Sequence, residues 1–319
     1  MTRAPIPLIL DFDTGVDDAL ALLLAARHPD VRLLAVTCVA GNTDVDQVVR
    51  NTLGVLAIAG ADEVPVARGA ERPLLEEHRD AGHVHGADGI AGVVLPERAR
   101  GAEPGHAVEL LRARILDSPD PVTLVPLGPL TNVALLLRTH PEVQRNLARI
   151  VVMGGTASVG NATPVAEFNV WHDPEAAAIV LASEAPVTMY GLDVFLRVAL
   201  SARDLRALGP EDPGAGLVRA LWENRPALGD ADTDGMLIGD AGAVCAAIDP
   251  DGIRVVRAPV TVVRDGAARG QTMVDRRAHR GESDLRGADW GPPVDVALEV
   301  DEARYRRLFL EHACAAVPG

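Results

Sequence analysis

Four aspartates within eight positions are the residues in this chain most suited to chemistry: Asp11, Asp13, Asp17 and Asp18. An apolar run at residues 6–10 precedes them and another follows, which places them between a buried strand and a helix. Like charges packed at a strand end are costly unless a cation neutralises them. One aspartate could cap the helix, but four indicate a hard divalent cation with oxygen ligands.

The elements that must position these residues alternate between apolar runs typical of buried strands and segments with helical spacing. Strands are expected at residues 6–10, 31–39, 65–67, 122–127, 150–153, 187–191, 253–263 and 294–299, and helices at 17–28, 45–60, 106–117, 130–139, 174–183, 217–223, 241–247 and 301–316. This order predicts an α/β fold with a doubly wound, mostly parallel (mixed) sheet and helices on both faces. We expect a single domain over residues 1–319, with loop-rich stretches at 69–102 and 200–242 that could cover a site.

Further polar motifs come directly after predicted strands. They are Gly41-Asn42-Thr43, the stretch 127–132 and Met153-Gly154-Gly155. Ligands of doubly wound sheets bind at the carboxyl ends of the strands. The sequence therefore predicts one site that combines these motifs with the aspartates.

Composition restricts the partners. The formal net charge of −15 and a pI near 5.0 argue against nucleic acid and anionic membranes. The three cysteines lack CxxC spacing, which fits a reducing compartment. No apolar run approaches the ~18 residues that a membrane span needs. We expect a cytoplasmic protein with a small-molecule ligand.

Several motifs in order resemble the inosine–uridine-type nucleoside hydrolases, over about residues 6–310. They are the Asp-x-Asp-x-Gly-x-Asp-Asp element at 11–18, Val39-Ala40-Gly41-Asn42, the stretches 124–132 and 151–155, and the stretch 160–169 together with 173–177. The resemblance implies hydrolysis of the N-glycosidic bond of a ribonucleoside to free base and ribose. It also implies a tightly held Ca²⁺ and a homodimer or homotetramer.

The resemblance further implies a role for each matching residue. Asp13 is a Ca²⁺ ligand and the general base that activates a water at the metal, while Asp11 supports the ligands. The other metal ligands are Asp18, Asp240 and the backbone carbonyl of Leu127. The ribose contacts implied are Asp17, Asn169 and Asp240 at the 2′- and 3′-hydroxyls, Asn161 and Glu167 at the 5′-hydroxyl, Asn42 near the water, and Met153 under the sugar.

Each ribose contact has an alternative. Asn42 and Asn161 follow glycines and could be left-handed turn residues. Glu167 and Asn169 alternate along a segment expected to be extended and could face solvent. Met153 could belong to the core.

The chain differs from the family at the position expected to assist the departure of the base. Many relatives carry His-Asp where this chain has Gly239-Asp240, and that histidine is proposed to protonate the base. His85 is the substitute, although it could be an exposed loop residue or, with His83, a fragment of a zinc site. Trp222 could stack on the base or pack in the core.

Three functions compete. The first is a Ca²⁺-dependent ribonucleoside hydrolase with Asp13 and His85 as catalytic residues. The second is a ribose- or nucleoside-binding protein with weak or altered catalysis, because position 239 is glycine. A Mg²⁺-dependent phosphohydrolase is the third, and it lacks identifiable basic phosphate ligands near these motifs.

Overall fold

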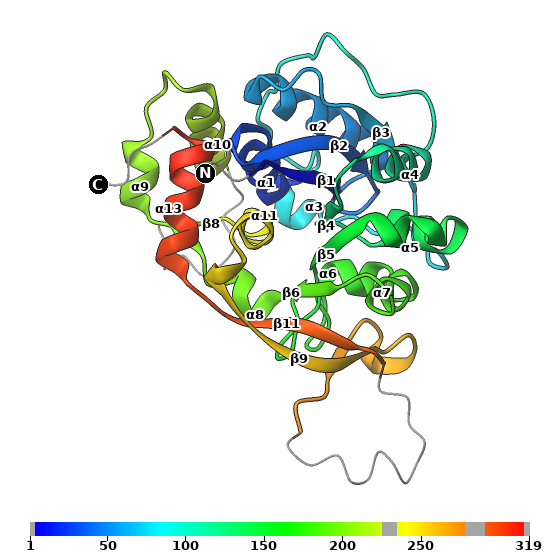
Figure 1. Cartoon of the computed structure of the whole chain (residues 1–319). Helices are drawn as coiled ribbons and strands as arrows, with labels where there is room; N and C mark the ends of the chain where they lie inside the picture. The colour runs from blue at the N-terminus through cyan, green and yellow to red at the C-terminus, as the bar shows by residue number, and fades with distance from the viewer. Residues whose placement is uncertain (1–3, 225–234, 278–290, 316–319) are drawn as a thin grey trace, which may run out of the picture.

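A nine-stranded sheet forms the centre of the protein in the computed structural model, which describes residues 4–224, 235–277 and 291–315. The strand order is β10-β9-β11-β6-β5-β4-β1-β2-β3 (Figure 1). The strands are β1 (Ile6–Phe12), β2 (Val31–Cys38), β3 (Val66–Arg68), β4 (Val122–Pro126), β5 (Leu147–Met153), β6 (Val187–Tyr190), β9 (Ile253–Val262), β10 (Thr272–Val274) and β11 (Pro293–Val300). β7 (Ala199–Leu200) and β8 (Met236–Leu237) form a separate two-stranded sheet.

The pairing within the large sheet is mixed. The strands from β11 to β3 in this order are all parallel to their neighbours, and β9 runs antiparallel to both β11 and β10. The predicted α/β class with a mostly parallel, mixed sheet is therefore confirmed. β10, an edge strand of three residues, was not expected from the sequence.

Helices cover both faces of the sheet. They are α1 (Val16–Arg27), α2 (Val45–Ala59), α3 (Gly82–His85), α4 (Ala107–Asp117), α5 (Thr131–Thr139), α6 (Phe168–His172), α7 (Pro174–Leu181), α8 (Leu192–Phe195), α9 (Ala202–Ala207), α10 (Pro213–Asn224), α11 (Asp240–Ile248) and α13 (Glu302–Ala313). α1, α10, α11 and α13 lie on one side, and α4, α5 and α7 lie on the other (Figure 1). Side chains of β1 alternate between the two cores: Leu8 and Leu10 join one, and Ile9 joins the other.

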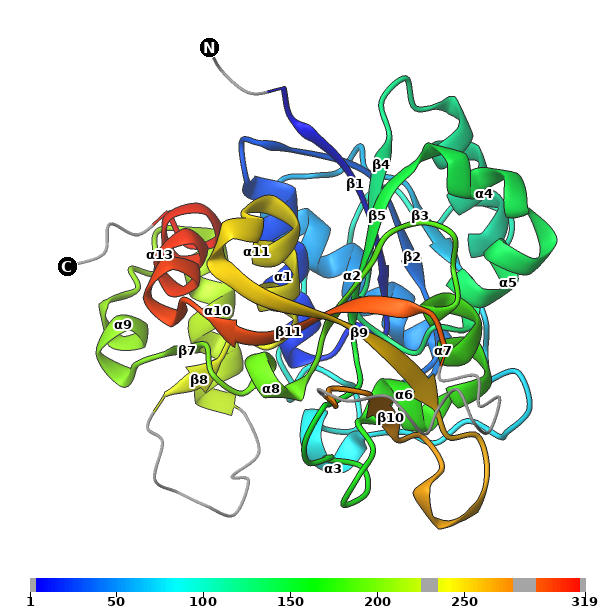
Figure 2. The same ribbon diagram turned by 60° about the horizontal axis from the view of Figure 1, so that its bottom comes forward.

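The central strands end at the same edge of the sheet, so the polar motifs at their carboxyl ends lie close together. β1 ends just before Asp13, and the backbone N–H of Leu127, just after β4, donates to the carbonyl of Asp11 at 2.8 Å. β5 ends at Met153. The short helices α3, α6 and α8 lie at the same lower end of the molecule in Figure 2.

Asn169 lies in α6 and Glu167 is the N-cap of that helix, so the expectation of an extended segment was wrong from Phe168 onwards. Glu167 caps α6: its Oε1 accepts from the N–H of Asn169 at 2.8 Å, and its Oε2 accepts from the N–H of Val170 at 3.1 Å. Glu167 and Asn169 are both buried, so the capped helix directs both side chains toward the interior and not toward solvent. An acid at the N-cap is the local signal that sequence reasoning overlooked.

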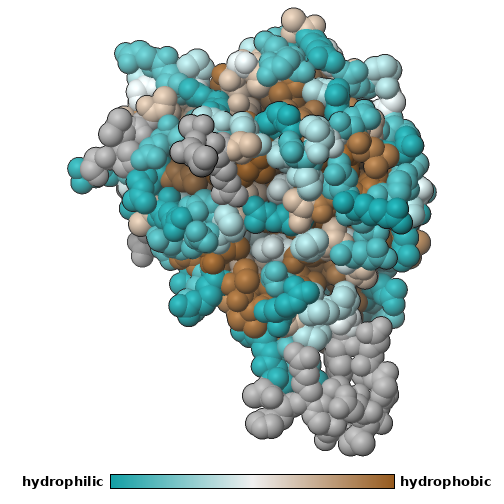
Figure 3. All heavy atoms as spheres, in the orientation of Figure 1, coloured by the Kyte–Doolittle hydropathy of each residue, from teal (hydrophilic) through white to brown (hydrophobic). Residues whose placement is uncertain are grey.

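The surface mixes hydrophilic and hydrophobic residues. On the face of Figure 3, the described hydrophobic residues form separate patches among hydrophilic ones. None of the helices in the described ranges is both long enough and apolar enough to span a bilayer.

Candidate active site

A cavity of about 260 Å³ opens where the central strands end. Polar groups from the strand ends line one part of it, and residues of α3, α6 and α8 line another. The lining residues are Asp13, Asp17, Asn42, Asp80, Ala81, His83, Val84, His85, Leu127, Met153, Asn161, Ala162, Glu167, Phe168, Asn169, Trp171, Phe195 and Asp240.

Acidic oxygens converge at this cavity. Asp17, Asp18 and Asp240 each offer a carboxylate oxygen, and these oxygens lie within 4.8 Å of one another. Asp18 Oδ2 accepts from the N–H of Gly15 at 2.8 Å and from Asn42 Nδ2 at 3.1 Å. Asp18 Oδ1 is buried and has no hydrogen-bond partner among the described residues, so it is free to bind a cation.

Asp13 lies beside this group rather than in it. Its Oδ2 accepts from the backbone N–H of Asn42 at 2.8 Å, and its carboxylate also contacts that of Asp18. We had expected Asp13 to be one of the three closely spaced aspartates. The structure places Asp17 in that set instead. Asp13, Asp18 and Asp240 are nevertheless buried together.

The electrostatics of the cluster fit a bound cation. Burial raises the pKa of Asp13 and of Asp240 well above the usual range, and the charges of neighbouring aspartates add to both effects. Burial and the charge of Asp17 raise the pKa of Asp18 to about 7. A divalent cation among these oxygens would stabilise their ionised forms. The donor set therefore fits a hard metal ion.

Asp11 supports the cluster without lining the cavity. Its Oδ1 accepts from Thr37 Oγ1 at 2.6 Å and from Asn132 Nδ2 at 2.8 Å. Burial raises its pKa to about 7. Asn132 Nδ2 also donates to the carbonyl of Cys38 at 3.0 Å, so it ties β1 to β2 at this point.

Asn169 connects the expected metal and sugar positions. Its Nδ2 donates to the carbonyl of Leu127 at 2.7 Å and to that of Met153 at 3.2 Å. Because Nδ2 makes these two bonds, the other amide atom, Oδ1, is the acceptor that is available to a ligand hydroxyl. Met153 is 4% exposed and lines the cavity, so it belongs to the core and to the site together.

The structure decides between the alternatives for the two asparagines that follow glycines. Among the described residues other than glycine, positive φ occurs only at Ala91 and Ala315. Asn42 and Asn161 are therefore not left-handed turn residues, and both line the cavity. Asn161 Oδ1 accepts from the N–H of Phe168 at 2.9 Å, which leaves its Nδ2 to face a ligand.

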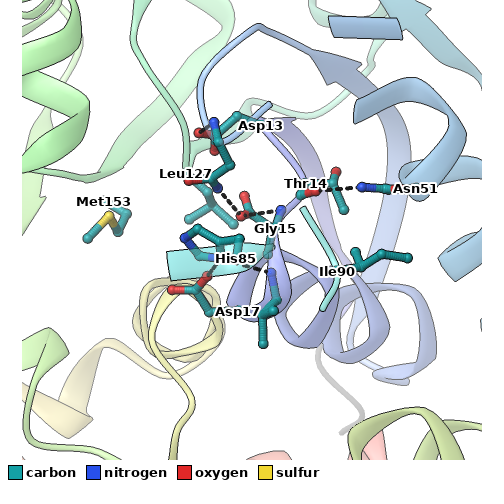
Figure 4. A network of polar contacts seen from close by, with 12 residues as sticks. Asp13, Thr14, Gly15, Asp17, Asn51, His85, Ile90, Leu127 and Met153 are labelled. Carbon is teal, nitrogen blue, oxygen red and sulfur yellow. Dashed lines mark hydrogen bonds and ion pairs between the residues drawn. The ribbon is translucent and has the colours of Figure 1, made fainter. Parts of the chain in front are cut away.

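His85 lies at the C-terminal end of α3, against the aspartate cluster (Figure 4). Its Nδ1 accepts from the backbone N–H of Val16 at 3.3 Å and lies 3.8 Å from Asp17 Oδ1. Its side chain is 13% exposed, and burial lowers its pKa, so the ring is neutral at pH 7 with the proton on Nε2. No histidine of the described residues belongs to a group of three metal-binding side chains, which argues against the zinc alternative.

Gly239 sits where no side chain fits. Its φ is +46°, and a Cβ there would lie 2.6 Å from Asp17 Oδ2 and 2.8 Å from Phe195 Cζ. The backbone at position 239 therefore packs closely against Asp17 and Phe195.

Trp222 does not line the cavity. It lies on α10, packs against the core, and has the Arg206 guanidinium 6.0 Å from its ring centroid. The aromatic residues that line the cavity are Phe168, Trp171 and Phe195. Phe168 lies inside the segment that resembles the family and could have been found there, whereas Trp171 and Phe195 carry no motif.

Comparisons with known proteins identify the family of this chain. Residues 8–307 match the sequence profile of the family "Inosine-uridine preferring nucleoside hydrolase". The pyrimidine-specific ribonucleoside hydrolase RihA of Photobacterium profundum is 40% identical over 278 residues, 85% of this chain and 89% of that protein. RihA of Citrobacter koseri is 47% identical over 221 residues, 68% and 70% of the two chains.

Solved structures are similar over nearly the full length. A plant nucleoside hydrolase, PpNRh1, has a TM-score of 0.89 at 30% identity and covers 98% of this chain and 100% of its own. The purine-preferring ribonucleoside hydrolase from Gardnerella vaginalis has a TM-score of 0.86 at 31% identity, with 97% and 98% covered. The fold and the site thus define an N-glycosyl hydrolase, a nucleosidase. The chain belongs to the inosine-uridine preferring nucleoside hydrolase family.

Proposed function

We propose that this protein hydrolyses the N-glycosidic bond of pyrimidine ribonucleosides with the help of Ca²⁺. The observation that carries the mechanism is the buried aspartate cluster, with its unpartnered Asp18 Oδ1, at the wall of a cavity lined by polar and aromatic groups. The pyrimidine preference is supported by the relatives named pyrimidine-specific, which are 40% and 47% identical to this chain.

Asp13, Asp18, Asp240 and the carbonyl of Leu127 would hold the cation, with the Asp17 oxygen close by. When bound, Ca²⁺ would hold the attacking water and make it more acidic. Asp13 takes the proton of that water while the water oxygen bonds to C1′ of the ribose. The nearby carboxylates stabilise the positive charge that develops on the sugar as the C1′–N bond breaks.

Asn169, Asp17 and Asp240 bind the 2′- and 3′-hydroxyls in this proposal. Asn169 Oδ1 accepts from a hydroxyl while its Nδ2 stays bonded to Leu127 and Met153. Asn161 and Glu167 bind the 5′-hydroxyl, Asn42 orients Asp13 and Asp18 near the water, and Met153 packs under the sugar.

His85 acts on the departing base. The electron pair of the C1′–N bond goes to the base, and His85 Nε2–H donates a hydrogen bond to the developing negative charge. The released base then takes its proton from solvent water, and Asp13 gives up the proton of the attacking water to solvent. The bond from Val16 to Nδ1 supports this role because it fixes the proton on Nε2.

Release of reducing sugar from uridine, cytidine, inosine and adenosine tests the proposal, with and without chelator. We expect the pyrimidine nucleosides to be cleaved fastest and chelator to stop cleavage. Failure to cleave any of these, and p-nitrophenyl riboside as well, would reject hydrolysis. The activated riboside needs little help at its leaving group, so it reports on the aspartate cluster alone.

The second candidate is a nucleoside-binding protein of the same fold with weak or altered catalysis. Gly239 favours it, because the usual leaving-group histidine is absent. It predicts that inosine or ribose stabilises the Ca²⁺-loaded protein without product. Turnover that disappears in Asp13→Ala would reject it.

Assembly and location stay predictions. We propose a homodimer or homotetramer, which light scattering after size-exclusion chromatography would test. A cytoplasmic location is proposed from the cysteine usage, and cell fractionation would test it.

A further inference from the structure

Asn51 lies on α2, outside every motif that suggested the site. It is 2% exposed. Its Nδ2 donates to the backbone carbonyl of Thr14 at 3.1 Å (Figure 4). It also donates to the backbone carbonyl of Asp88 at 2.8 Å. Its Oδ1 accepts from Gln47 Nε2 at 2.8 Å, which fixes the orientation of the amide. Both donor hydrogens of one buried side chain thus join two separate segments.

The first segment is the turn that carries the aspartates. Thr14 stands between Asp13 and Gly15, and the Gly15 N–H donates to Asp18. The Thr14 hydroxyl lies 2.6 Å from that of Thr52, so α2 holds this residue by its side chain as well as by its carbonyl.

The second segment is the turn that follows His85. The carbonyl of His85 accepts from the N–H of Ala91 at 2.8 Å, and Asp88 Oδ1 accepts from the N–H of Ile90 at 3.1 Å. Gly89 has φ +78°, and a Cβ there would lie 3.3 Å from Asn51 Nδ2. The turn therefore packs directly on the Asn51 amide. Because the His85 carbonyl is bonded to Ala91 in this turn, the position of the turn also sets the position of the His85 backbone.

We infer that Asn51 is a positioning residue that fixes the His85 ring relative to the aspartate turn, and this inference rests on the role proposed above for His85. The two segments touch directly where the Val16 N–H meets His85 Nδ1 at 3.3 Å, a long hydrogen bond. The Asn51 amide supplies the second connection. A carboxylate of the same shape would place an oxygen against two carbonyl oxygens and push the segments apart.

Asn51→Asp and the milder Asn51→Ala test the inference, with uridine and p-nitrophenyl riboside as substrates. We expect kcat for uridine to fall by roughly 10–100-fold, as for other residues that orient a catalytic group. The kcat for the activated riboside should fall much less, because that leaving group does not need His85 and the Thr52 hydroxyl still holds Thr14 in the aspartate turn. In the His85→Ala background, adding Asn51→Ala should cause no further loss with uridine.

Asn146→Asp is the matched control. Asn146 Nδ2 also joins two backbone carbonyls, of Ile115 and Ser118, but it does not line the cavity. We expect this variant to lower the melting temperature and to leave both kcat values unchanged.

Three results would overturn the inference: an unchanged kcat for uridine, equal losses with both substrates, or a full multiplicative loss on top of His85→Ala. A wild-type protein that cleaves neither substrate would instead reject the proposed function, and the inference with it. The two failures are therefore distinguishable.

Discussion

The aspartate cluster stands at the carboxyl end of β1 and the start of α1, whereas the facing wall comes from the short helices α3, α6 and α8. Backbone pairing between parallel strands places the cluster, and backbone N–H groups hold Asp13 and Asp18 directly. The wall is held mainly through side chains: Asn169 on α6 donates to the carbonyls of Leu127 and Met153, and His85 on α3 accepts from the N–H of Val16. Residues on a sheet are held in one geometry, and residues on short connecting helices are freer to differ between relatives.

The relatives support this distinction. One is named pyrimidine-specific and another purine-preferring, although both are similar to this chain over most of its length. We interpret the cluster as the part that carries the common hydrolysis, and the aromatic residues of the wall, Phe168, Trp171 and Phe195, as the part that selects the base. The following predictions test that interpretation, from the largest effect to the smallest.

Asp13→Asn should have the largest effect. Loss of the general base should lower kcat by roughly 10²–10⁴-fold. The loss should be similar for uridine and p-nitrophenyl riboside, because both need an activated water. Steady-state kinetics with the two substrates measure it, and a much smaller loss with the activated riboside would contradict the role of Asp13.

Removal of the cation should abolish activity and lower the melting temperature. Without the cation, the carboxylates of Asp13, Asp18 and Asp240 are buried together and disfavour one another's charge. Calorimetry before and after dialysis against chelator measures the shift, and added Ca²⁺ should restore both properties. Full activity after exhaustive chelation would contradict a metal at the cluster.

Gly239→Ala should lower kcat for all substrates, because the new Cβ would meet Asp17 Oδ2 and Phe195 Cζ. Gly239→His should lower it further instead of supplying an acid. Gly216→Ala is the control, since α10 has open space at that Cβ position and alanine favours helix. An increase in uridine cleavage by Gly239→His would show that the position can still hold a leaving-group acid.

Phe168→Ala and Trp171→Ala should change base preference more than the common chemistry. Each removes an aromatic face from the cavity wall, and stacking on a base is worth about 1–3 kcal/mol. We expect the ratio of kcat/KM for uridine to that for inosine to change, while Trp222→Ala leaves this ratio alone. Equal losses for both nucleosides would remove the distinction between cluster and wall.

An effect of pH on stability should come from His172, at the end of α6. Burial, followed by the charges of His78 and Arg79, lowers its pKa to about 3. Between this value and the unfolded value near 6.5, the unfolded chain binds more protons, so stability is lost as pH falls through that window. Melting temperatures should show a shallower fall in His172→Gln than in the wild type. Parallel curves would contradict a neutral, buried His172.

Much of the fold could be predicted from the sequence, because its signals are local. Apolar runs marked the eight strands that were expected, and helical spacing marked the long helices. The motifs that follow β1, β4 and β5 met in one cavity, as the rule for carboxyl ends requires. α6 was missed because five residues with an acidic cap look like an extended segment when only alternation is considered.

By itself, the sequence determined that four acids follow a buried strand and that a segment similar to the family's ribose-binding segment lies downstream. Only the tertiary structure decided that Gly239 packs on Asp17, that Phe168 rather than Trp222 lines the cavity, and that Asn51 joins two segments of the site. The reason is physical. Acid clusters and periodicity are properties of neighbours in the chain, whereas these contacts join residues far apart in sequence that only packing brings together.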